Sequence, residues 1–512
     1  MLNSFLFNFW LWFLYLIIFI LMLILNVSNV YFCIFYLLVS TTILCFKSDM
    51  FKGVFKIKYT SRMLRTIIVS FVLCFLIDCV FVLIFPFNFF CYLLPFVFLF
   101  DYWVLSCVLL LLLPLDLFTS KYYIAKSKKK LYAFNNLVKI GITGSFGKTS
   151  TKEILNTILS EKFYVLSTPK SFNTPLGISK TINDSLTEKH EVFICEMGAK
   201  RVNEIKYLCD YVKVDYGIVT AVGRQHTSTF GSVENIYKAK KELPDFLHNK
   251  TCVFNLMNSF VKKMYDDFDG NKLGVFCVLK HKIKINYSVL KKCKILKFKV
   301  LKNKIYYEFN KYLNVYAKNI VITDKGTLFD IYYGCCLISS TETVLLGIHN
   351  VINILLSVAM SLMLGLNFEQ IRLGLSKIKQ IHARMEKFIT GNGAVVINNG
   401  YNSNIDSAKF SLGVLEFFDK KYKVVITPGL IESEDDYLYN KNLGQVISRY
   451  ATDVVLVKNK NKNALYSGLL SSGFDMSRVK FVQSFSEAKK LFDYASSEYV
   501  ILIENDLPDN YV

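Results

Sequence analysis

The chain has 512 residues, of which 53% are hydrophobic, 15% are aromatic and only 20% are charged, and its formal net charge is +21. This many apolar and aromatic residues exclude a disordered or collagen-like chain. Six of the 61 basic and four of the 40 acidic residues lie in residues 1–120, which leaves 55 basic and 36 acidic residues, a net charge of +19, for residues 121–512. This uneven distribution argues against a purely soluble cytosolic protein and predicts an apolar N-terminal region joined to a basic soluble part.

Four apolar runs fill residues 1–120, and crossing a bilayer takes about 20 apolar residues. They cover residues 5–25, 31–46, 66–86 and 91–118. The basic segments that flank the last two runs should face the cytoplasm. We therefore predict about four transmembrane helices in residues 1–120 and a multi-pass location in the cytoplasmic membrane, with catalytic domains in the cytoplasm. An anchor is the simplest role for this region, although Asp78 and Asp101 are ionisable candidates for a function at membrane depth.

A phosphate-binding loop is predicted after a basic linker at residues 121–136. Residues 137–143 favour a strand and residues 150–160 favour a helix, and Gly144-Ser-Phe-Gly-Lys-Thr149 forms the turn between them. Backbone N–H groups at a helix N-terminus bind phosphate, Lys148 neutralises its charge, and the Thr149 hydroxyl can ligate Mg²⁺. The bland alternative is a chance Gly/Lys turn, because Ile142 stands where the general phosphate-loop pattern has glycine.

Two further predicted strands end at residues suited to a metal ion. Residues 192–195 end on Glu196, and residues 216–220 lead to His226. Ligands of open α/β sheets bind at the carboxyl ends of the strands, where a nucleotide's Mg²⁺ would lie. Taken alone, Glu196 is more often a solvated carboxylate and His226 a loop histidine.

The C-terminal part favours a second, smaller sheet. Apolar strands are predicted at residues 423–427, 453–457 and 499–503, with helices between them, which is typical of a doubly wound sheet. The predicted fold class is thus an α-helical transmembrane region followed by α/β. It comprises a phosphate-loop ATPase domain at residues 137–380 and a small doubly wound, Rossmann-like domain at residues 381–512.

Several motifs follow one another along the basic part. They are Gly141-Ile-Thr-Gly-Ser-Phe-Gly-Lys-Thr149, Asn173-Thr-Pro-Leu-Gly177, Glu196-Met-Gly198, His226, Phe230-Gly-Ser232, Ala239-Lys-Lys-Glu242, Gly347-Ile-His-Asn-Val-Ile-Asn353, His382-Ala-Arg-Met-Glu386 and Tyr401-Asn-Ser-Asn404. In this order they resemble the Mur ligase family, whose ATP loop reads T-G-x-x-G-K-T and itself lacks the first glycine. The resemblance covers about residues 137–512, and the Phe-Gly-Ser and Tyr-Asn-x-Asn runs resemble the MurF branch.

The resemblance implies an ATP-dependent amide-forming ligase of peptidoglycan precursor synthesis. Such an enzyme works through an acyl phosphate, uses ATP and Mg²⁺, and in the MurF branch adds D-alanyl-D-alanine to a UDP-MurNAc-peptide. The implied nucleotide-binding residues are Gly144, Ser145, Gly147, Lys148, Thr149, Ser150, Asn350 and Arg384. The implied metal-site residues are Thr149, Glu196, His226 and Lys240, and the implied catalytic residues are Lys148, Lys240 and His226. Lys240 matches the lysine that the family carbamylates; without the resemblance it would be a solvated lysine in a Lys-rich helix.

The sequence also departs from the family pattern. The predicted spans occupy the place of the domain that holds the UDP-sugar, and acidic positions near the nucleotide are replaced by Asn258, Asn398 and Asn399, while Glu504 replaces a lysine. Two alternatives follow: a membrane-bound Mur-type ligase that acts on a lipid-linked cell-wall precursor or related polymer, and a non-catalytic nucleotide-binding membrane scaffold. The expected partners are a UDP-MurNAc-peptide or lipid-linked acceptor, an amino-acid or dipeptide amine, and the membrane. Nucleic acid is not expected, because the basic residues are spread and no base-stacking motif accompanies them.

Overall fold

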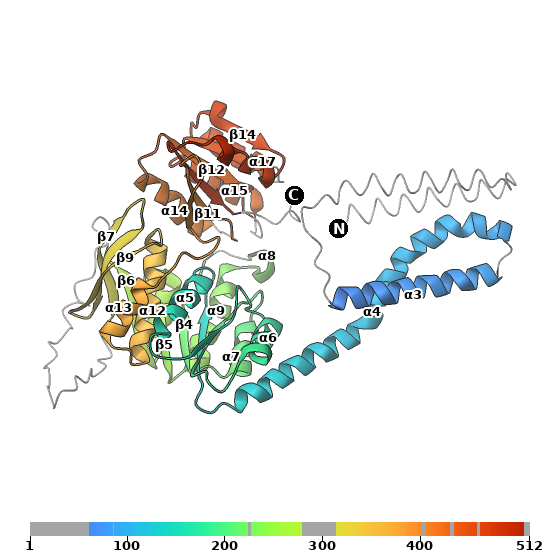
Figure 1. The fold of residues 1–512 in the computed structure, drawn as a ribbon, viewed down its shortest axis with the longest axis horizontal. Helices are drawn as coiled ribbons and strands as arrows, with labels where there is room; N and C mark the ends of the chain where they lie inside the picture. Colours follow the sequence, from blue (N-terminus) through green and yellow to red (C-terminus); the bar gives the residue numbers. More distant parts are fainter. Residues whose placement is uncertain are drawn as a thin grey trace. The chain divides into compact units, whose positions relative to one another are not determined.

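The computed structural model describes residues 61–84, 87–223, 227–278, 314–401, 405–430, 435–457 and 461–505, and the chain divides into two compact units, Met1–Tyr122 and Tyr123–Val512. In the first unit the described residues form helix α3 (Ser61–Ile84) and most of helix α4 (Phe87–Tyr132) (Figure 1). Arg62 and Arg65 of α3 both pair with Asp116 of α4. The runs predicted at 66–86 and 91–118 fall largely in these helices, whereas those at 5–25 and 31–46 lie outside the described residues.

The predicted multi-pass location in the cytoplasmic membrane, with catalytic domains in the cytoplasm, is wrong. Across the described residues a single helical stretch, Cys107–Tyr132, combines the length and apolar composition that crossing a membrane requires, and one such stretch is weak evidence. An apolar run in a sequence predicts an apolar environment. It does not by itself distinguish a bilayer from a protein interior.

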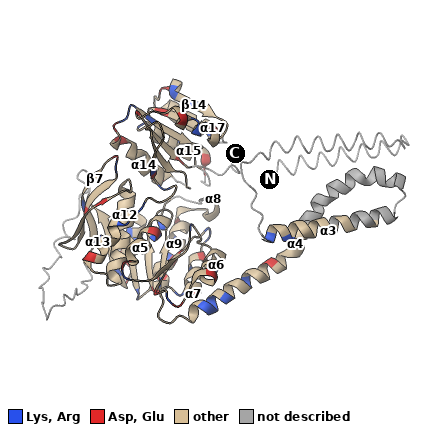
Figure 2. Cartoon of the chain, viewed as in Figure 1, with Lys and Arg blue, Asp and Glu red and all other residues tan. Residues whose placement is uncertain are grey.

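The predicted basic linker at residues 121–136 is helical over most of its length. Helix α4 continues to Tyr132, because the Lys, Ala and Leu residues there favour a helix and neither Gly nor Pro interrupts it. Ser127 and Leu131 are buried against the second unit's own residues, and the Ser127 hydroxyl contacts the Tyr211 hydroxyl. Figure 2 shows the Lys and Arg residues gathered along this end of α4, which includes Lys129 and Lys130 in its last turn.

The second unit is built around a nine-stranded sheet with the strand order β2-β3-β1-β4-β5-β6-β7-β8-β9. The strands from β2 to β7 are parallel, and β8 and β9 add an antiparallel edge. The parallel strands are rich in Val and Ile and are mostly buried, as expected of strands covered on both faces. The strands are β1 (Val138–Thr143), β2 (Val165–Ser167), β3 (Val192–Glu196), β4 (Tyr216–Val219), β5 (Thr251–Asn255), β6 (Asn271–Cys277), β7 (Val315–Ile322), β8 (Thr327–Tyr333) and β9 (Cys336–Thr343).

Helices pack on both faces of this sheet and form two separate cores. Neighbouring residues of β3 alternate between them: Ile194 joins the core with α5, α12 and α13, and Phe193 joins the core with α6, α7, α9, α10 and the end of α4. The bounds are α5 (Lys148–Leu159), α6 (Pro175–Ser185), α7 (Glu204–Val212), α8 (Thr227–Phe230), α9 (Val233–Leu247), α10 (Ser259–Asp267), α12 (Ile348–Met363) and α13 (Phe368–Ser376).

A six-stranded sheet with the order β10-β11-β15-β12-β13-β14 forms the C-terminal lobe. Only β10 runs antiparallel to its neighbour, and helices cover both faces. Its elements are β10 (Glu386–Ile389), β11 (Val395–Asn399), α14 (Ile405–Gly413), η2 (Val414–Phe417), β12 (Tyr422–Thr427), α15 (Asp436–Ile447), β13 (Asp453–Val457), α16 (Lys462–Ser471), η3 (Met476–Arg478), β14 (Val479–Val482), α17 (Phe485–Lys489), α18 (Leu491–Tyr494) and β15 (Tyr499–Glu504). The predicted α/β architecture is confirmed, and its larger sheet is mixed. The domain boundaries at 136/137 and 380/381 stay predictions.

Candidate functional site

The predicted phosphate loop connects the end of β1 to the start of α5. Gly144 has a φ of 151°, and a Cβ added there would lie 2.0 Å from the Thr220 Oγ1. Gly147 has a φ of 83°, and a Cβ there would lie 2.7 Å from the Asn353 Oδ1. Only glycine meets both demands, a left-handed backbone and close neighbours. The two glycines therefore let the loop fit closely between the end of β4 and helix α12.

Lys148 is the first residue of α5, and its side chain folds back over the loop. The Nζ donates to the backbone carbonyls of Gly144 at 2.6 Å and Ser145 at 3.2 Å. Removal of the ammonium from water lowers the pKa of Lys148 to about 8, the negative charge of Glu196 opposes this shift, and Arg384 adds to it. The ammonium of Lys148 thus contacts only neutral backbone carbonyls of the loop. A bound phosphate would give it a negatively charged partner.

Thr149 and Glu196 meet beside the loop. The register of β1 and β3 pairs Ile142 with Glu196, so the carboxylate lies where β3 ends next to the loop. The Thr149 hydroxyl donates to the Glu196 Oε2 at 2.9 Å, and the Asn173 Nδ2 donates to the Oε1 at 3.2 Å. Glu196 is only 1% exposed, so its carboxylate is held by hydrogen bonds in a buried setting.

These oxygen groups fit a magnesium ion. Mg²⁺ prefers oxygen ligands and is usually held by one or two protein groups together with substrate phosphates and waters. The Thr149 hydroxyl and the Glu196 carboxylate provide two such groups next to the phosphate loop. Within the described part of the chain, no group of three or more His, Cys, Asp or Glu residues forms a metal site of its own. His226, the other predicted ligand, lies outside the described residues.

Lys240 is buried on α9, although it belongs to a Lys-rich segment. The Phe230-Gly-Ser232 motif starts this helix, because the Ser232 hydroxyl accepts from the Asn235 N–H as an N-cap. The Lys240 side chain is 3% exposed, and its Nζ lies 5.9 Å from the centre of the Phe230 ring. Burial, followed by the positive charge of Lys148, lowers the pKa of Lys240 to about 7. At pH 7 a lysine with this pKa is neutral in about half of the molecules, and the neutral amine is nucleophilic.

A cavity of about 470 Å³ opens next to the loop, between the central sheet and the C-terminal lobe. It brings together four of the predicted nucleotide-binding residues, Gly147, Ser150, Asn350 and Arg384. Asn350 is held at the start of α12, where its Nδ2 donates to the Leu346 carbonyl and its Oδ1 accepts from Asn353. The roles of these residues in binding a nucleotide stay predictions.

Arg384 reaches from the start of the C-terminal lobe to the phosphate loop. Its guanidinium donates to the Thr149 Oγ1 at 3.0 Å and lies 4.3 Å from the centre of the Tyr401 ring. The Tyr401 hydroxyl in turn donates to the Ser171 Oγ at 2.7 Å. Burial lowers the pKa of Arg384, while Glu196 opposes that shift. Two contacts thus connect the C-terminal lobe to the residues around Glu196.

The replaced acidic positions make coherent contacts. The register of β11 and β15 places Asn399 directly beside Glu504, and the Asn399 Nδ2 donates to the Glu504 Oε2 at 3.0 Å. An aspartate at 399 would put two carboxylates side by side, and they would repel each other. The amide of Asn399 instead donates a hydrogen bond to the Glu504 carboxylate. Asn258 caps α10 and bonds to Val222, and Asn255 donates to the Thr220 carbonyl at 2.8 Å. These asparagines therefore stabilise the strand ends that surround the loop.

Sequence reasoning missed other residues of the cavity and of the Glu196 environment. His349 and Phe410 line the cavity, and Lys152 is completely buried beside Glu196. His349 belongs to the Gly347–Asn353 motif, and burial lowers its pKa to about 4. For Lys152 the available signal was its position one helical turn after Lys148.

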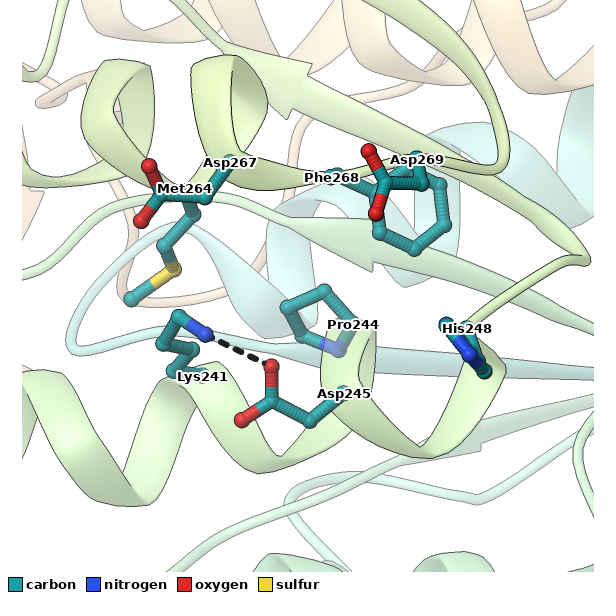
Figure 3. A pocket seen from close by; sticks show the side chains of 8 residues that line it. All are labelled: Lys241, Pro244, Asp245, His248, Met264, Asp267, Phe268 and Asp269. Carbon is teal, nitrogen blue, oxygen red and sulfur yellow. Dashed lines mark hydrogen bonds and ion pairs between the residues drawn. The ribbon is translucent and has the colours of Figure 1, made fainter.

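A second cavity, of about 250 Å³, lies at the far end of α9 and contains none of the predicted site residues (Figure 3). On its α9 side the Lys241 Nζ and the Asp245 Oδ1, one helical turn apart, form an ion pair at 2.8 Å. The remaining lining residues are Pro244, His248, Met264, Asp267, Phe268 and Asp269. We therefore place the candidate site at the larger cavity.

The parallel sheet, the glycine loop and the Lys-Thr pair that opens α5 define an α/β protein of the phosphate-loop class. A family model described as the Mur ligase middle domain matches residues 142–293. Residues 142–293 are thus similar to the middle domain of the Mur ligases.

Curated relatives carry the name UDP-N-acetylmuramoyl-tripeptide–D-alanyl-D-alanine ligase. The protein of Buchnera aphidicola subsp. Acyrthosiphon pisum is 27% identical over 318 residues, which cover 62% of this chain and 63% of that protein. The protein of Haemophilus influenzae is 26% identical over 377 residues, which cover 72% and 71% of the two chains. The chain thus spans somewhat less than two thirds of the length of the Buchnera relative.

Solved structures show the same fold. MurF from Acinetobacter baumannii matches with a TM-score of 0.61 and 20% identity, covering 76% of this chain and 77% of that chain. MurF ligase from Thermotoga maritima, in complex with ADP, matches with a TM-score of 0.60 and 19% identity, covering 75% and 80%. The predicted resemblance to the Mur ligases, with MurF proteins among the relatives, is confirmed.

Proposed function

We propose that this chain is an ATP- and Mg²⁺-dependent amide-forming ligase of the MurF type, which joins D-alanyl-D-alanine to UDP-MurNAc-tripeptide. The observation that carries the proposal is the grouping of Lys148, Thr149 and Glu196 at the ends of β1 and β3. Arg384 reaches this group from the C-terminal lobe. The names of the relatives support the choice of substrates.

In the first step, an oxygen of the acceptor carboxylate attacks the γ-phosphorus of ATP, the bond to the β–γ bridging oxygen breaks, and ADP leaves. The product is an acyl phosphate, a far better electrophile than a carboxylate. The loop amides and the Lys148 ammonium stabilise the charge on the transferring phosphoryl group, since phosphoryl transfer depends mainly on positioning and on neutralising charge. Thr149 and Glu196 would hold Mg²⁺, which neutralises phosphate charge and orients the phosphates.

In the second step, the amine of D-alanyl-D-alanine attacks the acyl carbon. A tetrahedral intermediate forms, inorganic phosphate leaves, and the amine loses a proton as the amide forms. Both substrates must be held close while water is excluded. Arg384 and Tyr401 fit this requirement, because they connect the C-terminal lobe to Thr149 and Ser171.

Lys240 supports the metal site in this proposal. The resemblance implies that its amine is carbamylated, which replaces a positive charge with a negative one. Carbamylation needs a neutral amine to attack CO₂, and the pKa of about 7 provides that amine near neutral pH. The buried position beside Phe230 keeps the product away from bulk water.

The test is product formation by the full chain with ATP, Mg²⁺, D-alanyl-D-alanine and UDP-MurNAc-tripeptide, followed by mass spectrometry. We expect an amide product and stoichiometric ADP, and neither with Lys148→Ala. A polyprenyl-linked acceptor is assayed in parallel, because product with that acceptor alone would support a ligase for lipid-linked precursors. Failure with every acceptor, and an unchanged result for Lys148→Ala in cell growth, would support a non-catalytic scaffold.

A further inference from the structure

One buried lysine takes no part in the steps above. Lys152 lies on α5, one helical turn after Lys148, and its long side chain is 0% exposed. Lysine is almost never fully buried unless it is paired. The partners of its ammonium therefore indicate why it is there.

Lys152 has two carboxylate neighbours in very different settings. Its Nζ lies 3.6 Å from the Glu196 Oε2 and 3.2 Å from the Glu153 Oε1. The Glu196 side chain is 1% exposed, whereas that of Glu153 is 43% exposed. Charge interactions are stronger where water is excluded. Glu196 is therefore the main electrostatic partner, although Glu153 is slightly nearer.

The same ammonium also holds the loop at residues 168–174, which wraps around Glu196. Lys152 donates to the backbone carbonyl of Lys170, in the middle of the loop, where φ is 49°. At the start of the loop the Thr168 Oγ1 accepts from the Glu196 N–H at 3.1 Å. Near its end Asn173 donates to the Glu196 Oε1. The loop thus contacts Glu196 on both sides of the point that Lys152 fixes.

We propose that Lys152 is a positioning residue for Glu196. Its ammonium holds the carboxylate in one orientation and fixes the middle of the loop, so that Asn173 remains bound to the second carboxylate oxygen. The proposal rests on the proposed function, because the purpose of this orientation is to present Glu196 to a divalent cation. Removal of a group that hydrogen-bonds to a metal ligand and orients it commonly weakens metal binding.

The test compares three variants of the full chain. Lys152→Met keeps the length of the side chain without its charge, Lys152→Arg keeps the charge, and Glu153→Gln removes only the exposed partner. Two quantities are measured: hydrogen exchange of the 168–174 peptide without ligand, and binding of Mn²⁺ in the presence of ADP by electron paramagnetic resonance.

For Lys152→Met we expect about tenfold faster exchange in the loop and about tenfold weaker Mn²⁺ binding, with exchange in α12 and ADP affinity without metal unchanged. Lys152→Arg should recover part of both losses, and Glu153→Gln should match the wild type. The pair of readouts separates positioning from general destabilisation, which would also speed exchange in α12.

Wild-type values for both quantities in Lys152→Met would overturn the proposal, as would a change in only one of them or the same losses in Glu153→Gln. If Lys152→Met does not fold, Asn173→Ala replaces it, because this half-buried side chain joins the loop to the Glu196 carboxylate. Unchanged Mn²⁺ binding in Asn173→Ala would then reject the proposal. Failure of the wild type to bind Mn²⁺ with ADP would instead reject the proposed function, and loop exchange would still test Lys152.

Discussion

Replacing Lys240 with Met should stabilise the protein while it abolishes activity. The Lys240 ammonium is buried on α9, and burial together with Lys148 lowers its pKa from 10.5 to about 7. Methionine fills a similar volume without a charge, so the variant loses the penalty of a desolvated ammonium. The same substitution removes the amine that the proposed mechanism needs.

The size of the effect follows from the pKa shift. Each pKa unit corresponds to about 1.4 kcal/mol, so below pH 7 the lysine destabilises the fold by at most about 5 kcal/mol. Between pH 7 and 10.5 the unfolded chain binds more protons at this site than the folded chain, so the stability of the wild type rises with pH in that window. At pH 9.5 a penalty of about 1 kcal/mol remains.

Urea denaturation at pH 6.5 and at pH 9.5 in CO₂-free buffer, where Lys240 carries no carbamate, measures this directly. The advantage of Lys240→Met over the wild type should shrink by about 3 kcal/mol between the two pH values. Lys238→Met is the matched control, because Lys238 is exposed on the same helix and should show no such trend. A difference between Lys240→Met and the wild type that is the same at both pH values would refute the reasoning.

Three further predictions concern the loop and the lobe contact. Gly144→Ala should destabilise the protein by about 2 kcal/mol or more in urea denaturation, because the new Cβ would meet Thr220 in a strained backbone; Gly413→Ala, with open space around it, should be nearly neutral. Lys148→Met should weaken ATP binding about tenfold or more in equilibrium dialysis, and unchanged affinity would contradict the phosphate role. Arg384→Ala should lower kcat more than it raises KM for ATP, and a change in KM alone would contradict the lobe contact.

Local signals in the sequence were sufficient to predict the turn between β1 and α5 and the position of Glu196 at the end of β3. Two glycines, a lysine and a threonine between a strand and a helix form a pattern within a dozen residues, and Glu196 follows its strand directly. The part-buried contact between Asn399 and Glu504 was not predictable in this way. These residues are adjacent only through the register of β11 and β15, which joins segments about a hundred residues apart in the chain.

The other differences between the sequence predictions and the structure arise from the burial of charged or polar residues. Lys152 occurs among polar residues of α5, and a lysine there is normally solvated; its burial results from the loop at 168–174, a contact that no helical pattern contains. Lys240 was assigned only through the family motif, because its neighbours Lys238 and Lys241 predict an exposed helix face. At residues 121–136 the charge predicted a linker, whereas Ser127 and Leu131 bury one side of a continuous helix.

Transfer of oxygen from the acceptor to phosphate tests the central claim most directly. UDP-MurNAc-tripeptide labelled with ¹⁸O in the reacting carboxylate is incubated with the full chain, ATP, Mg²⁺ and D-alanyl-D-alanine, and the released phosphate is analysed by mass spectrometry. An acyl phosphate intermediate predicts that one labelled oxygen leaves with each phosphate while the amide forms. Unlabelled phosphate, or ATP hydrolysis without amide formation, would contradict the proposed ligase.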